Sequence, residues 1–393
     1  MIHNEEFSNR LATWRHRIHE YPEAAFEEEK TATFVAEKLR EFGYDVHTGI
    51  GLTGVVATMT VGNGKDVIGL RADMDCLCNT EQGEHPYTSK VPGRFHGCGH
   101  DGHTISLLGA AELIAKNRDF NGTVRLVFQP AEEPGKGALA MMEDKVLENF
   151  PMDEMYAIHN WPALPQGTIH MNTGGFMASE DNFTITIKGQ GGHASSPHLT
   201  VDPLIVAAQI IMGLQTIVSR NQNPLHPSVV SITEMTTDGV HNTIPSIVEI
   251  KGDTRSTTKE AQEIIEKRMR EIAQNTCAAY GAECDFVYTH EFVPLINAPK
   301  CVETAAKAAR KAVGEENVFT DATPVMASED FARFTNVVPG CYVLIGGDRQ
   351  DGSPVYSCHN PNFDYNDDNL EVGAWYYYEI VRTRLSQNEK GEE

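Results

Sequence analysis

The sequence is short of basic residues. Its 393 residues contain 32 Lys and Arg against 55 Asp and Glu, which gives a formal net charge of −23 at pH 7. Nucleic acids and anionic membrane surfaces attract proteins through clustered positive charge. The acidic balance, with a pI near 5.1, therefore argues against both as partners.

Long apolar runs and a secretory leader pattern are also missing. No uninterrupted apolar stretch reaches the roughly 18 to 20 residues that span a bilayer. The amino-terminal residues MIHNEE have neither the basic n-region nor the apolar h-region of a signal peptide. We therefore expect a cytoplasmic protein without a membrane partner.

Cysteine is sparse, and its spacing is not that of a disulfide framework or a redox motif. Eight cysteines in 393 residues are too few to hold a fold together through disulfides. Cys76 and Cys78 are separated by one residue, where a C-x-x-C motif has two. We expect most of the cysteines to be reduced and buried.

One short stretch is rich in metal-ligand side chains. Residues 96–103 (HGCGHDGH) combine histidines, a cysteine and an aspartate with glycines that let the backbone fold tightly. Thiolate, imidazole and carboxylate are ligands of first-row divalent metals, and the spacing of Cys98 and His100 can serve one ion. The alternative is a polar glycine-rich loop with an ordinary buried cysteine.

Strands and helices alternate along the first 182 residues. Expected strands cover 55–61, 66–70, 123–128 and 155–158, and expected helices cover 6–20, 31–42, 104–116 and 136–147. This alternation predicts an α/β domain with a mostly parallel sheet covered on both faces. Ligands collect beyond the carboxyl ends of such strands. The side chains expected there, close to residues 96–103, are Asp73, Asp75, Glu132, Glu133 and His159.

The first predicted helix carries His16 and His19, and no carboxylate accompanies them at a chelating spacing. We therefore expect His16 to lie on the helix surface and His19 at the helix end.

The pattern changes between residues 183 and 292. Strand, helix, strand, strand, helix and strand follow one another, which predicts a two-layer, ferredoxin-like α+β domain. The earlier pattern resumes with a helix at 302–313, a strand at 341–345 and a helix at 370–385. A chain of 393 residues is also longer than one core usually organises. We expect a domain built from 1–182 and 293–393, with the 183–292 domain inserted into it.

Six short motifs together resemble one family. They are RADMD at 71–75, GCGHDGH at 97–103, QPAEE at 129–133, HNWP at 159–162, GGHAS at 191–195 and CHN at 358–360. In this order they resemble the amidohydrolase branch of the aminoacylase-type metallopeptidases, which includes hippurate hydrolases, IAA-amino acid hydrolases and N-acetyldiaminopimelate deacetylases. The resemblance implies a catalytic domain with two divalent metal ions and a smaller lid domain that also mediates dimerisation.

The resemblance also implies roles for single residues. Carried over by position, the metal ligands are Cys98, His100, Glu133, His159 and His359, and the general base is Glu132. The chemistry is reasonable, because adjacent carboxylates can divide the work, with Glu133 on the metal and Glu132 on the attacking water. An isolated acidic pair is more often a solvated turn. The strand end and the surrounding ligands favour the catalytic role.

Neighbouring polar residues receive supporting roles. We expect Asp75 to orient a ligand imidazole, whereas Asp101 and His103 lie beside the site without being required by the ligand count. Cys76 and Cys78 stand where relatives usually have Ala and Pro, and Gly97 replaces a common Ala. The two cysteines either supply an extra soft ligand or pack as small apolar side chains, and we favour packing.

Three residues of the inserted domain are candidates for contact with the substrate. In the family the histidine equivalent to His193 reaches the active site of the partner subunit and donates a hydrogen bond to the developing oxyanion; otherwise it is a surface turn residue. Asn242 and Arg255 are candidates for substrate binding, since a guanidinium suits an α-carboxylate. Either of these two residues could equally lie on the lid surface.

The predicted activity is hydrolysis of N-acyl amino acids, such as N-acetyl or N-benzoyl derivatives, to a carboxylic acid and an amino acid. The predicted cofactors are two divalent ions per subunit, Mn²⁺ or Zn²⁺, with Ni²⁺ or Co²⁺ as alternatives. The predicted assembly is a homodimer, or a tetramer, formed through the lid domain. Three alternatives stay open. They are a di-metal aminopeptidase or dipeptidase acting on unblocked peptides, a non-catalytic dimeric binding protein, and a structural metal module. The presence of Glu132 beside Glu133 argues against the structural module, because a closed ligand shell has no free base.

Overall fold

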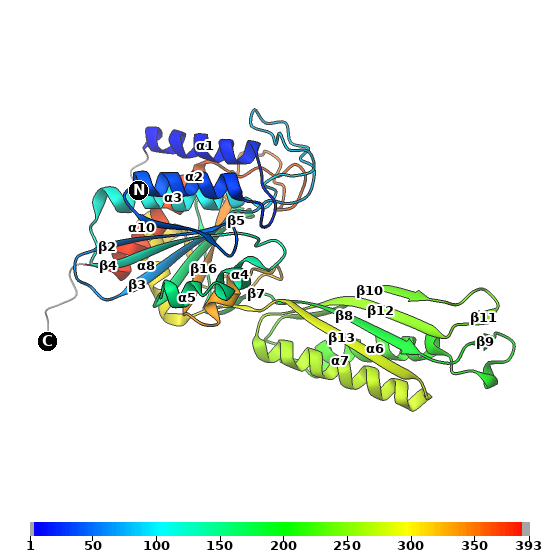
Figure 1. The fold of residues 1–393 in the computed structure, drawn as a ribbon. Helices are drawn as coiled ribbons and strands as arrows, with labels where there is room; N and C mark the ends of the chain where they lie inside the picture. The colour runs from blue at the N-terminus through cyan, green and yellow to red at the C-terminus, as the bar shows by residue number, and fades with distance from the viewer. Residues whose placement is uncertain (1–3, 387–393) are drawn as a thin grey trace, which may run out of the picture. The chain divides into compact units, whose positions relative to one another are not determined.

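The computed structural model describes residues 4–386, so the first three residues of the amino-terminal stretch considered above lie outside it. Its chain forms two compact units (Figure 1). The first contains the chain up to Gly174, Ile296–Thr323 and the chain from Arg333 onward. The second contains Gly175–Leu295 and Pro324–Ala332. This unit thus extends beyond the predicted range 183–292 at both ends and gains a separate segment.

The first unit is built on an eight-stranded sheet of order β1-β2-β4-β3-β5-β16-β6-β15. The strands are β1 (Asp45–Ile50), β2 (Gly54–Val61), β3 (Val67–Asp73), β4 (Gly122–Gln129), β5 (Glu154–Pro165), β6 (Ile169–His170), β15 (Val318–Phe319) and β16 (Gly340–Asp348). The neighbours β4, β3, β5 and β16 are parallel. The pairs β1–β2 and β2–β4 are antiparallel. The predicted α/β class is therefore confirmed, with a parallel centre and an antiparallel edge.

Helices pack on this sheet and on one another. They are α1 (Glu5–Glu20), α2 (Glu29–Glu41), α3 (His100–Asn117), α4 (Gly137–Glu143), α5 (Val146–Asn149), α8 (Pro299–Val313) and α10 (Asp368–Arg384). The central helix α3 contacts β3, α10 and α1, and α8 lies against α10 and β16. Fourteen of the 18 residues of α3 are buried, so this helix is enclosed by other parts of the protein on nearly all sides. It forms the middle of the core.

Three predicted element boundaries were wrong near the site. Helix α3 begins at His100 and not at Thr104, because Gly99 takes a left-handed conformation (φ 92°) that lets the helix start directly after it. His159 lies inside β5, which continues to Pro165 instead of ending before it. The single helix expected at 136–147 is divided into α4 and α5, with Lys145 at φ 59° between them.

The second unit has the predicted ferredoxin-like order. Its elements are β8 (Glu180–Lys188), α6 (Pro203–Arg220), β10 (Ser228–Thr237), β12 (Ile247–Ser256), α7 (Lys259–Tyr280) and β13 (Glu283–Phe292). The sheet order β10-β12-β8-β13 is antiparallel throughout. Alternate side chains such as Phe183, Ile185 and Ile187 pack against apolar residues of α6 and α7. This packing gives the second unit a core of its own.

Short elements complete the chain. They are β7 (Gly174–Met177), β9 (Gly192–His193), β11 (Thr243–Ile244), β14 (Leu295–Asn297), α9 (Ala332–Thr335) and the 3₁₀ turns Pro197–Leu199 and Glu315–Asn317. Among the described residues, only α6 has the length and composition of a membrane-crossing helix, and 33% of that stretch is buried inside the protein. Its buried side chains, which include Ile210, Leu214 and Ile217, belong to the core of the second unit.

Candidate metal centre

The metal-type side chains of the first unit come from four separate segments. Cys98 and His100 lie at the start of α3, His159 projects from β5, Glu133 follows β4, and His359 lies in the loop before α10. Strands β4 and β5 flank β3, and Asp73 at the end of β3 pairs with Gln129 at the end of β4. The sheet thus brings segments distant in sequence to one edge.

Among the described residues, five groups of ligand-type atoms are close enough to hold an ion, and two of these groups share Cys98. One contains Cys98, His100 and His159, the other contains Cys98, Glu133 and His359, and within each group the ligand atoms lie within 4.8 Å of one another. Cys98 Sγ is 3.4 Å from His159 Nε2, and Glu133 Oε2 is 3.5 Å from His359 Nε2. The two groups share Cys98 and together contain the residues predicted as metal ligands. Each group supplies three donors, the number typical of catalytic metal sites.

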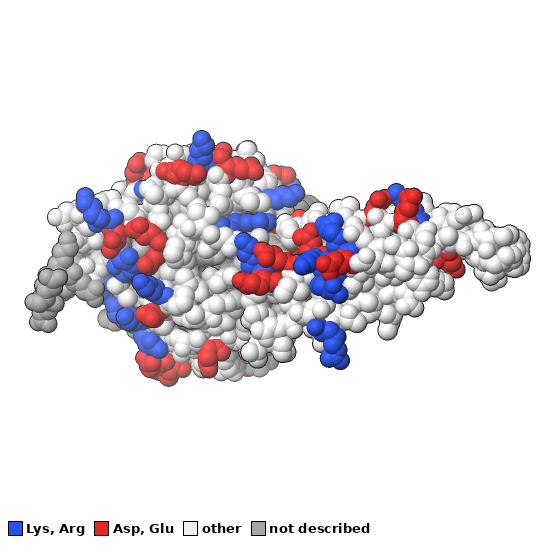
Figure 2. Space-filling view, turned by 90° about the horizontal axis from the view of Figure 1, so that it is seen from below, with Lys and Arg blue, Asp and Glu red and all other residues white. Residues whose placement is uncertain are grey.

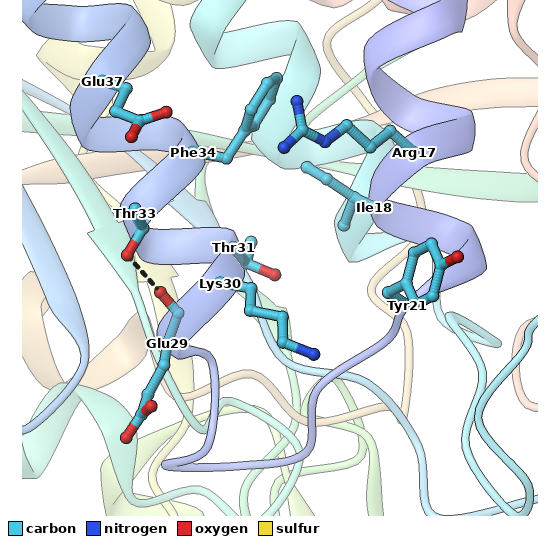
Figure 3. Close-up of a pocket in the computed structure, with 9 residues that line it drawn as sticks. All are labelled: Arg17, Ile18, Tyr21, Glu29, Lys30, Thr31, Thr33, Phe34 and Glu37. Atoms are coloured by element: carbon cyan, nitrogen blue, oxygen red, sulfur yellow. Dashed lines mark hydrogen bonds between the residues drawn. The ribbon is translucent and has the colours of Figure 1, made fainter.

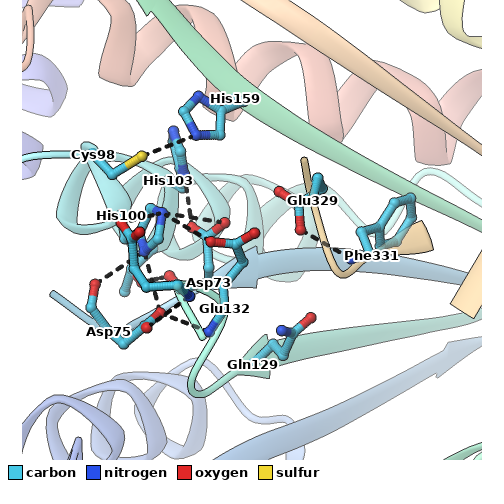
Figure 4. A network of polar contacts seen from close by, with 12 residues as sticks. Asp73, Asp75, Cys98, His100, His103, Gln129, Glu132, His159, Glu329 and Phe331 are labelled. Carbon is cyan, nitrogen blue, oxygen red and sulfur yellow. Dashed lines mark hydrogen bonds and ion pairs between the residues drawn. The ribbon is translucent and has the colours of Figure 1, made fainter. Parts of the chain in front are cut away.

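The Nε2 atom of the His100 ring lies among several carboxylates (Figure 4). Its Nδ1 faces the Asp75 carbonyl oxygen at 3.0 Å, and its buried Nε2 has no hydrogen-bond partner among the described residues. Carboxylate oxygens of Asp73, Glu132 and Glu133 each lie 3.9 Å from Nε2. Burial alone would lower the pKa of His100, but Asp73, Asp75 and Glu133 hold it well above its usual value. A cation therefore fits this donor set.

His159 is held as a neutral imidazole. Its Nδ1 donates a hydrogen bond of 2.6 Å to the Asn160 carbonyl oxygen, so the lone pair lies on Nε2, which faces Cys98. Burial, together with the nearby His103, keeps the pKa of His159 well below its usual value. A neutral ring whose second nitrogen is fixed by a carbonyl is the form in which histidine binds metals.

The pKa values of Cys98 and Glu133 are both raised, so a cation would have to displace the protons that these side chains carry. A hydrogen bond with Cys358, burial and the charge of Glu133 raise the pKa of the Cys98 thiol well above its usual value. Burial raises the pKa of Glu133 to about 7, although the charge of His100 opposes this change. Metal ligands must give up such protons when an ion binds.

The backbone of the loop after β4 is fixed by two buried carboxylates. Asp75 accepts hydrogen bonds from the backbone N–H groups of Glu132 (3.0 Å) and Glu133 (3.1 Å). Glu28 accepts one from the N–H of Ala131 at 2.8 Å, a residue held in the left-handed region at φ 49°. Asp75 also lies 3.2 Å from His100 Nδ1. This single carboxylate thus orients both an imidazole and the acidic pair.

Both ring nitrogens of His103 contact residues outside the two ligand groups that share Cys98. Its Nδ1 lies 2.7 Å from a carboxylate oxygen of Asp73, which also accepts a hydrogen bond from Arg71 at 2.8 Å. Its Nε2 accepts a hydrogen bond from the backbone N–H of Asn160. Through these contacts His103 holds Asp73 and Asn160, which lie next to the ligand groups.

His19 lies at the end of α1, as predicted, but it has the carboxylate partners that the sequence spacing did not indicate. The side chain is fully buried, with Nδ1 2.8 Å from Asp101 and Nε2 3.1 Å from Glu81. Arg15, one turn earlier on α1 and also fully buried, lies 3.3 Å from Asp101. His16 also has a carboxylate partner, Asp367 at 2.7 Å. The i,i+4 spacing of Arg15 and His19 places both on one helix face, but it does not identify their partners on distant segments.

Cys76 and Cys78 belong to neither ligand group. Cys76 is buried and Cys78 is exposed. The backbone N–H of Cys76 donates a 2.9 Å hydrogen bond to the Glu23 carbonyl oxygen. Packing of Cys76 agrees with the interpretation favoured above, whereas Cys78 faces the solvent.

His193 and Asn242 lie together in the second unit. His193 is exposed on β9, which pairs with β11, and the Ala194 N–H donates a 3.0 Å hydrogen bond to the Asn242 carbonyl oxygen. The N–H of Ser195 donates to His193 Nδ1, which leaves the proton of the neutral ring on Nε2. Residues 189–200 contain no Lys, Arg, Asp or Glu, and this end of the unit carries little charge on the face drawn in Figure 2.

Arg255 lies near the end of β12, in the four-stranded sheet and not in the β9–β11 pair. It forms ion pairs with Glu180 (2.8 Å) and Asp253 (3.0 Å). Along β12 the distance from Ile247 to Arg255 is roughly 25 Å at the usual rise per residue. Arg255 and Asn242 of one subunit therefore cannot contact the same small substrate, and both assignments stay predictions.

Two hollows of the first unit involve other residues. A groove of about 550 Å³ between α1 and α2 is lined by Arg17, Ile18, Tyr21, Glu29, Lys30, Thr31, Thr33, Phe34 and Glu37 (Figure 3). A smaller one of about 200 Å³ is lined by residues that include Pro162, Tyr356 and Asn362. Neither hollow is lined by a member of the two ligand groups, so the donor set and not the size of a hollow marks the site.

Comparison with known proteins gives the family. The model of peptidase family M20/M25/M40 matches residues 69–383. The chain belongs to this family. The M20 family thus accounts for the motifs noted in the sequence, and the resemblance inferred from them is confirmed.

Individual M20 relatives match along nearly the whole chain. A hippurate hydrolase of Campylobacter jejuni is 39% identical, over 93% of this chain and 94% of the relative. An N-acetylcysteine deacetylase of Bacillus subtilis is 37% identical, over 96% of this chain and 97% of the relative. The solved structure of the Bacillus subtilis YXEP protein, a dinuclear metal-binding peptidase of the M20 family, is 34% identical, with a TM-score of 0.85 over 97% of this chain and 99% of that one.

Proposed function

We propose that the protein is a metal-dependent amidohydrolase that cleaves N-acyl amino acids to a carboxylic acid and a free amino acid. Family membership and the names of the relatives support this activity. The observation that carries it is the pair of ligand groups that share Cys98, with Glu132 beside them. A structural metal module would have no need of a spare carboxylate next to its ligands.

Two divalent cations would be held by the two ligand groups, with Cys98 common to both. When bound, they supply Lewis acidity, which makes water acidic near neutral pH and stabilises charge on the amide oxygen. The mixture of thiolate, imidazole and carboxylate suits Zn²⁺ or Mn²⁺, with Ni²⁺ or Co²⁺ as alternatives. Asp75 keeps His100 oriented through its contact with Nδ1.

Glu132 is the residue we assign to proton transfer. Its backbone is held by Asp75, and its carboxylate lies near His100 without belonging to either group that shares Cys98. It would take the proton of the attacking water and pass it to the nitrogen of the leaving amine. The adjacent Glu133 would remain with the ions. The two acidic residues thus have separate tasks.

We further propose a homodimer in which His193 serves the partner subunit's active site. With its proton on Nε2, the His193 ring is set up to donate to a carbonyl oxygen as negative charge develops there. Apolar side chains on α6, such as Ile205 (53% exposed) and Met212 (69% exposed), together with the edge strand β10, support an interface on the second unit. The free cysteines are consistent with a cytoplasmic location.

The deciding experiment is a hydrolysis assay with metal control. The purified protein is stripped by chelation, reloaded with Zn²⁺ or Mn²⁺, and given N-benzoylglycine, N-acetylcysteine and an unblocked dipeptide. We expect release of the free amino acid from the acylated substrates only, and only after reloading. Preferential cleavage of the dipeptide would favour an aminopeptidase. No hydrolysis with any substrate or metal would favour a binding protein, and turnover that survives exhaustive chelation would contradict the site.

A further inference from the structure

A second thiol lies directly beside Cys98. Cys358 precedes His359, and its Sγ is 3.7 Å from the Cys98 carbonyl oxygen. The Asn160 side-chain amide donates to Cys358 Sγ at 3.5 Å. Cys358 is nevertheless absent from both ligand groups, so the proposed metal centre does not use this thiol.

The backbone holds the two cysteine segments together. The N–H of His359 donates a 2.7 Å hydrogen bond to the Gly97 carbonyl oxygen. Cys98 follows Gly97 and Cys358 precedes His359, so the two cysteines flank this hydrogen bond, and Cys358 Sγ lies 3.7 Å from the Cys98 carbonyl oxygen. A disulfide needs a Cα separation of about 4.4 to 6.8 Å. The two segments are therefore close enough for a disulfide without rearrangement of the fold.

The two thiols differ in access to solvent. Cys98 is 8% exposed, whereas Cys358 is partly exposed. Two other cysteines of the first unit, Cys301 and Cys341, are buried, and Cys78 is exposed. A small oxidant in solution can therefore reach Cys358 and, through it, Cys98.

We propose that Cys98 and Cys358 form a redox-sensitive pair, oxidised by hydrogen peroxide to a disulfide that excludes metal from the centre. The disulfide and the metal ions compete for the same Cys98 sulfur. The thiol pair is independent of the proposed function. Only the competition with metal rests on it, because it requires Cys98 to be a ligand.

The oxidation proceeds in two balanced steps. The Cys358 sulfur attacks peroxide, the O–O bond breaks, and a sulfenic acid forms with release of one water. The Cys98 sulfur then attacks the Cys358 sulfur, the S–O bond breaks, and a disulfide forms with release of a second water. Two thiols are oxidised for each peroxide reduced. A dithiol reductant reverses the reaction and frees Cys98.

The test uses the full-length, metal-free protein. It is treated with hydrogen peroxide at a small molar excess, the remaining thiols are alkylated, and the protein is digested and mapped by mass spectrometry. We expect a cross-linked pair of peptides containing Cys98 and Cys358, with a mass two hydrogens lower than the summed mass of the two reduced peptides. Cys358→Ser should give no such pair. Cys78→Ser, which removes an exposed thiol outside the pair, should still give it.

Metal content is the second readout. After peroxide, Zn²⁺ is added, unbound ion is removed, and bound zinc is counted by elemental analysis. We expect the wild type to bind less than half of the zinc of its reduced form, and to recover after dithiothreitol. Zinc binding by Cys358→Ser should be much less sensitive to the same peroxide dose.

Two results would overturn the proposal. Absence of the cross-link in the wild type, with Cys98 still free to be alkylated, contradicts the pair. A cross-link that forms while zinc binding is unchanged contradicts the competition, and shows in addition that Cys98 is not a metal ligand. Failure of the hydrolysis assay alone leaves both readouts intact, so the two proposals can fail separately.

Discussion

Glu132 and Glu133 are neighbours in sequence, and both carboxylates lie 3.9 Å from His100 Nε2, but their other surroundings differ. Glu133 lies 3.5 Å from His359 and shares a ligand group with Cys98, whereas Glu132 belongs to neither group that contains Cys98. We predict that Glu132→Gln lowers kcat by roughly 10² to 10⁴, the range typical of a lost general base. The same variant should keep both metal ions, because no proposed ligand is removed.

Glu133→Gln is the matched variant for this prediction, since it makes the same chemical change one residue away. It should lower the number of ions bound, measured by elemental analysis of the dialysed protein, as well as kcat. Equal metal loss in the two variants would contradict the division of tasks. Near wild-type turnover by Glu132→Gln would show that Glu132 is not the general base.

Glu28 is a buried carboxyl whose protonation is linked to stability. Burial raises its pKa from 4.5 to about 7. The folded state thus holds this proton more tightly than the unfolded state, and the stability from it is present below pH 4.5 and lost as pH rises to about 7. Glu28→Gln has no proton to lose. We predict that its free energy of unfolding, relative to wild type, rises across this window by up to ~3 kcal/mol.

The measurement is urea unfolding of the metal-free protein at several pH values between 4.5 and 8, with wild type and variant compared at each pH. Other titrating groups affect both proteins alike and cancel in the difference. Glu37→Gln, an exposed change on α2, is the control and should differ from wild type by no more than about 0.5 kcal/mol. A flat difference for Glu28→Gln would show that Glu28 is charged when folded.

At the scale of elements, one arginine joins three segments. Arg15 of α1 is fully buried and lies 3.3 Å from Asp101 on α3, 3.3 Å from Asp364 and 2.6 Å from Asp367. Its guanidinium also lies over the ring of Tyr87, 4.5 Å from the centroid. These contacts connect the first helix to the start of α3 and to the loop that follows His359.

We predict that Arg15→Met lowers the free energy of unfolding by roughly 3 to 5 kcal/mol, because it leaves buried carboxylates without their counter-charge. Arg17→Met, a change on the exposed face of the same helix, should cost about 0.5 kcal/mol or less. Chemical denaturation of both variants checks the difference. Similar losses in the two would show that the Arg15 contacts contribute little.

The order of the elements could be predicted from the sequence, because apolar periodicity is local information. The helix–strand order of the second unit is an example, and so is the strand that carries Val124 and Leu126. The start of α3 was missed because it depends on the left-handed backbone of Gly99. The Arg15–Asp101 contact was missed because its partners are 86 residues apart, and spacing along one helix carries no signal for such a pair.

At the scale of the whole molecule, motif recognition supplied the residues predicted as metal ligands, and the structure adds their grouping around Cys98. The proposed role of His193 lies beyond both, because it depends on a second copy of the chain, and the proposed role of Asn242 in substrate binding stays a prediction. Both residues are exposed at one end of the second unit, far along β12 from Arg255. If His193 acts in the partner's site, activity is a property of the dimer.

Subunit mixing tests this directly. Glu132→Ala and His193→Ala are each expected to be nearly inactive as homodimers, since every active site lacks either its base or its donor. In a mixed dimer, the site whose base comes from the His193→Ala subunit receives an intact His193 from the Glu132→Ala subunit. Subunits exchanged at random give half mixed dimers, each with one complete site, so we predict recovery of about a quarter of the wild-type activity per subunit. Recovery should disappear when both chains also carry Met212→Glu, which places a charge on the proposed interface. If His193 acts within its own subunit, the mixed dimer contains no complete site and mixing restores nothing.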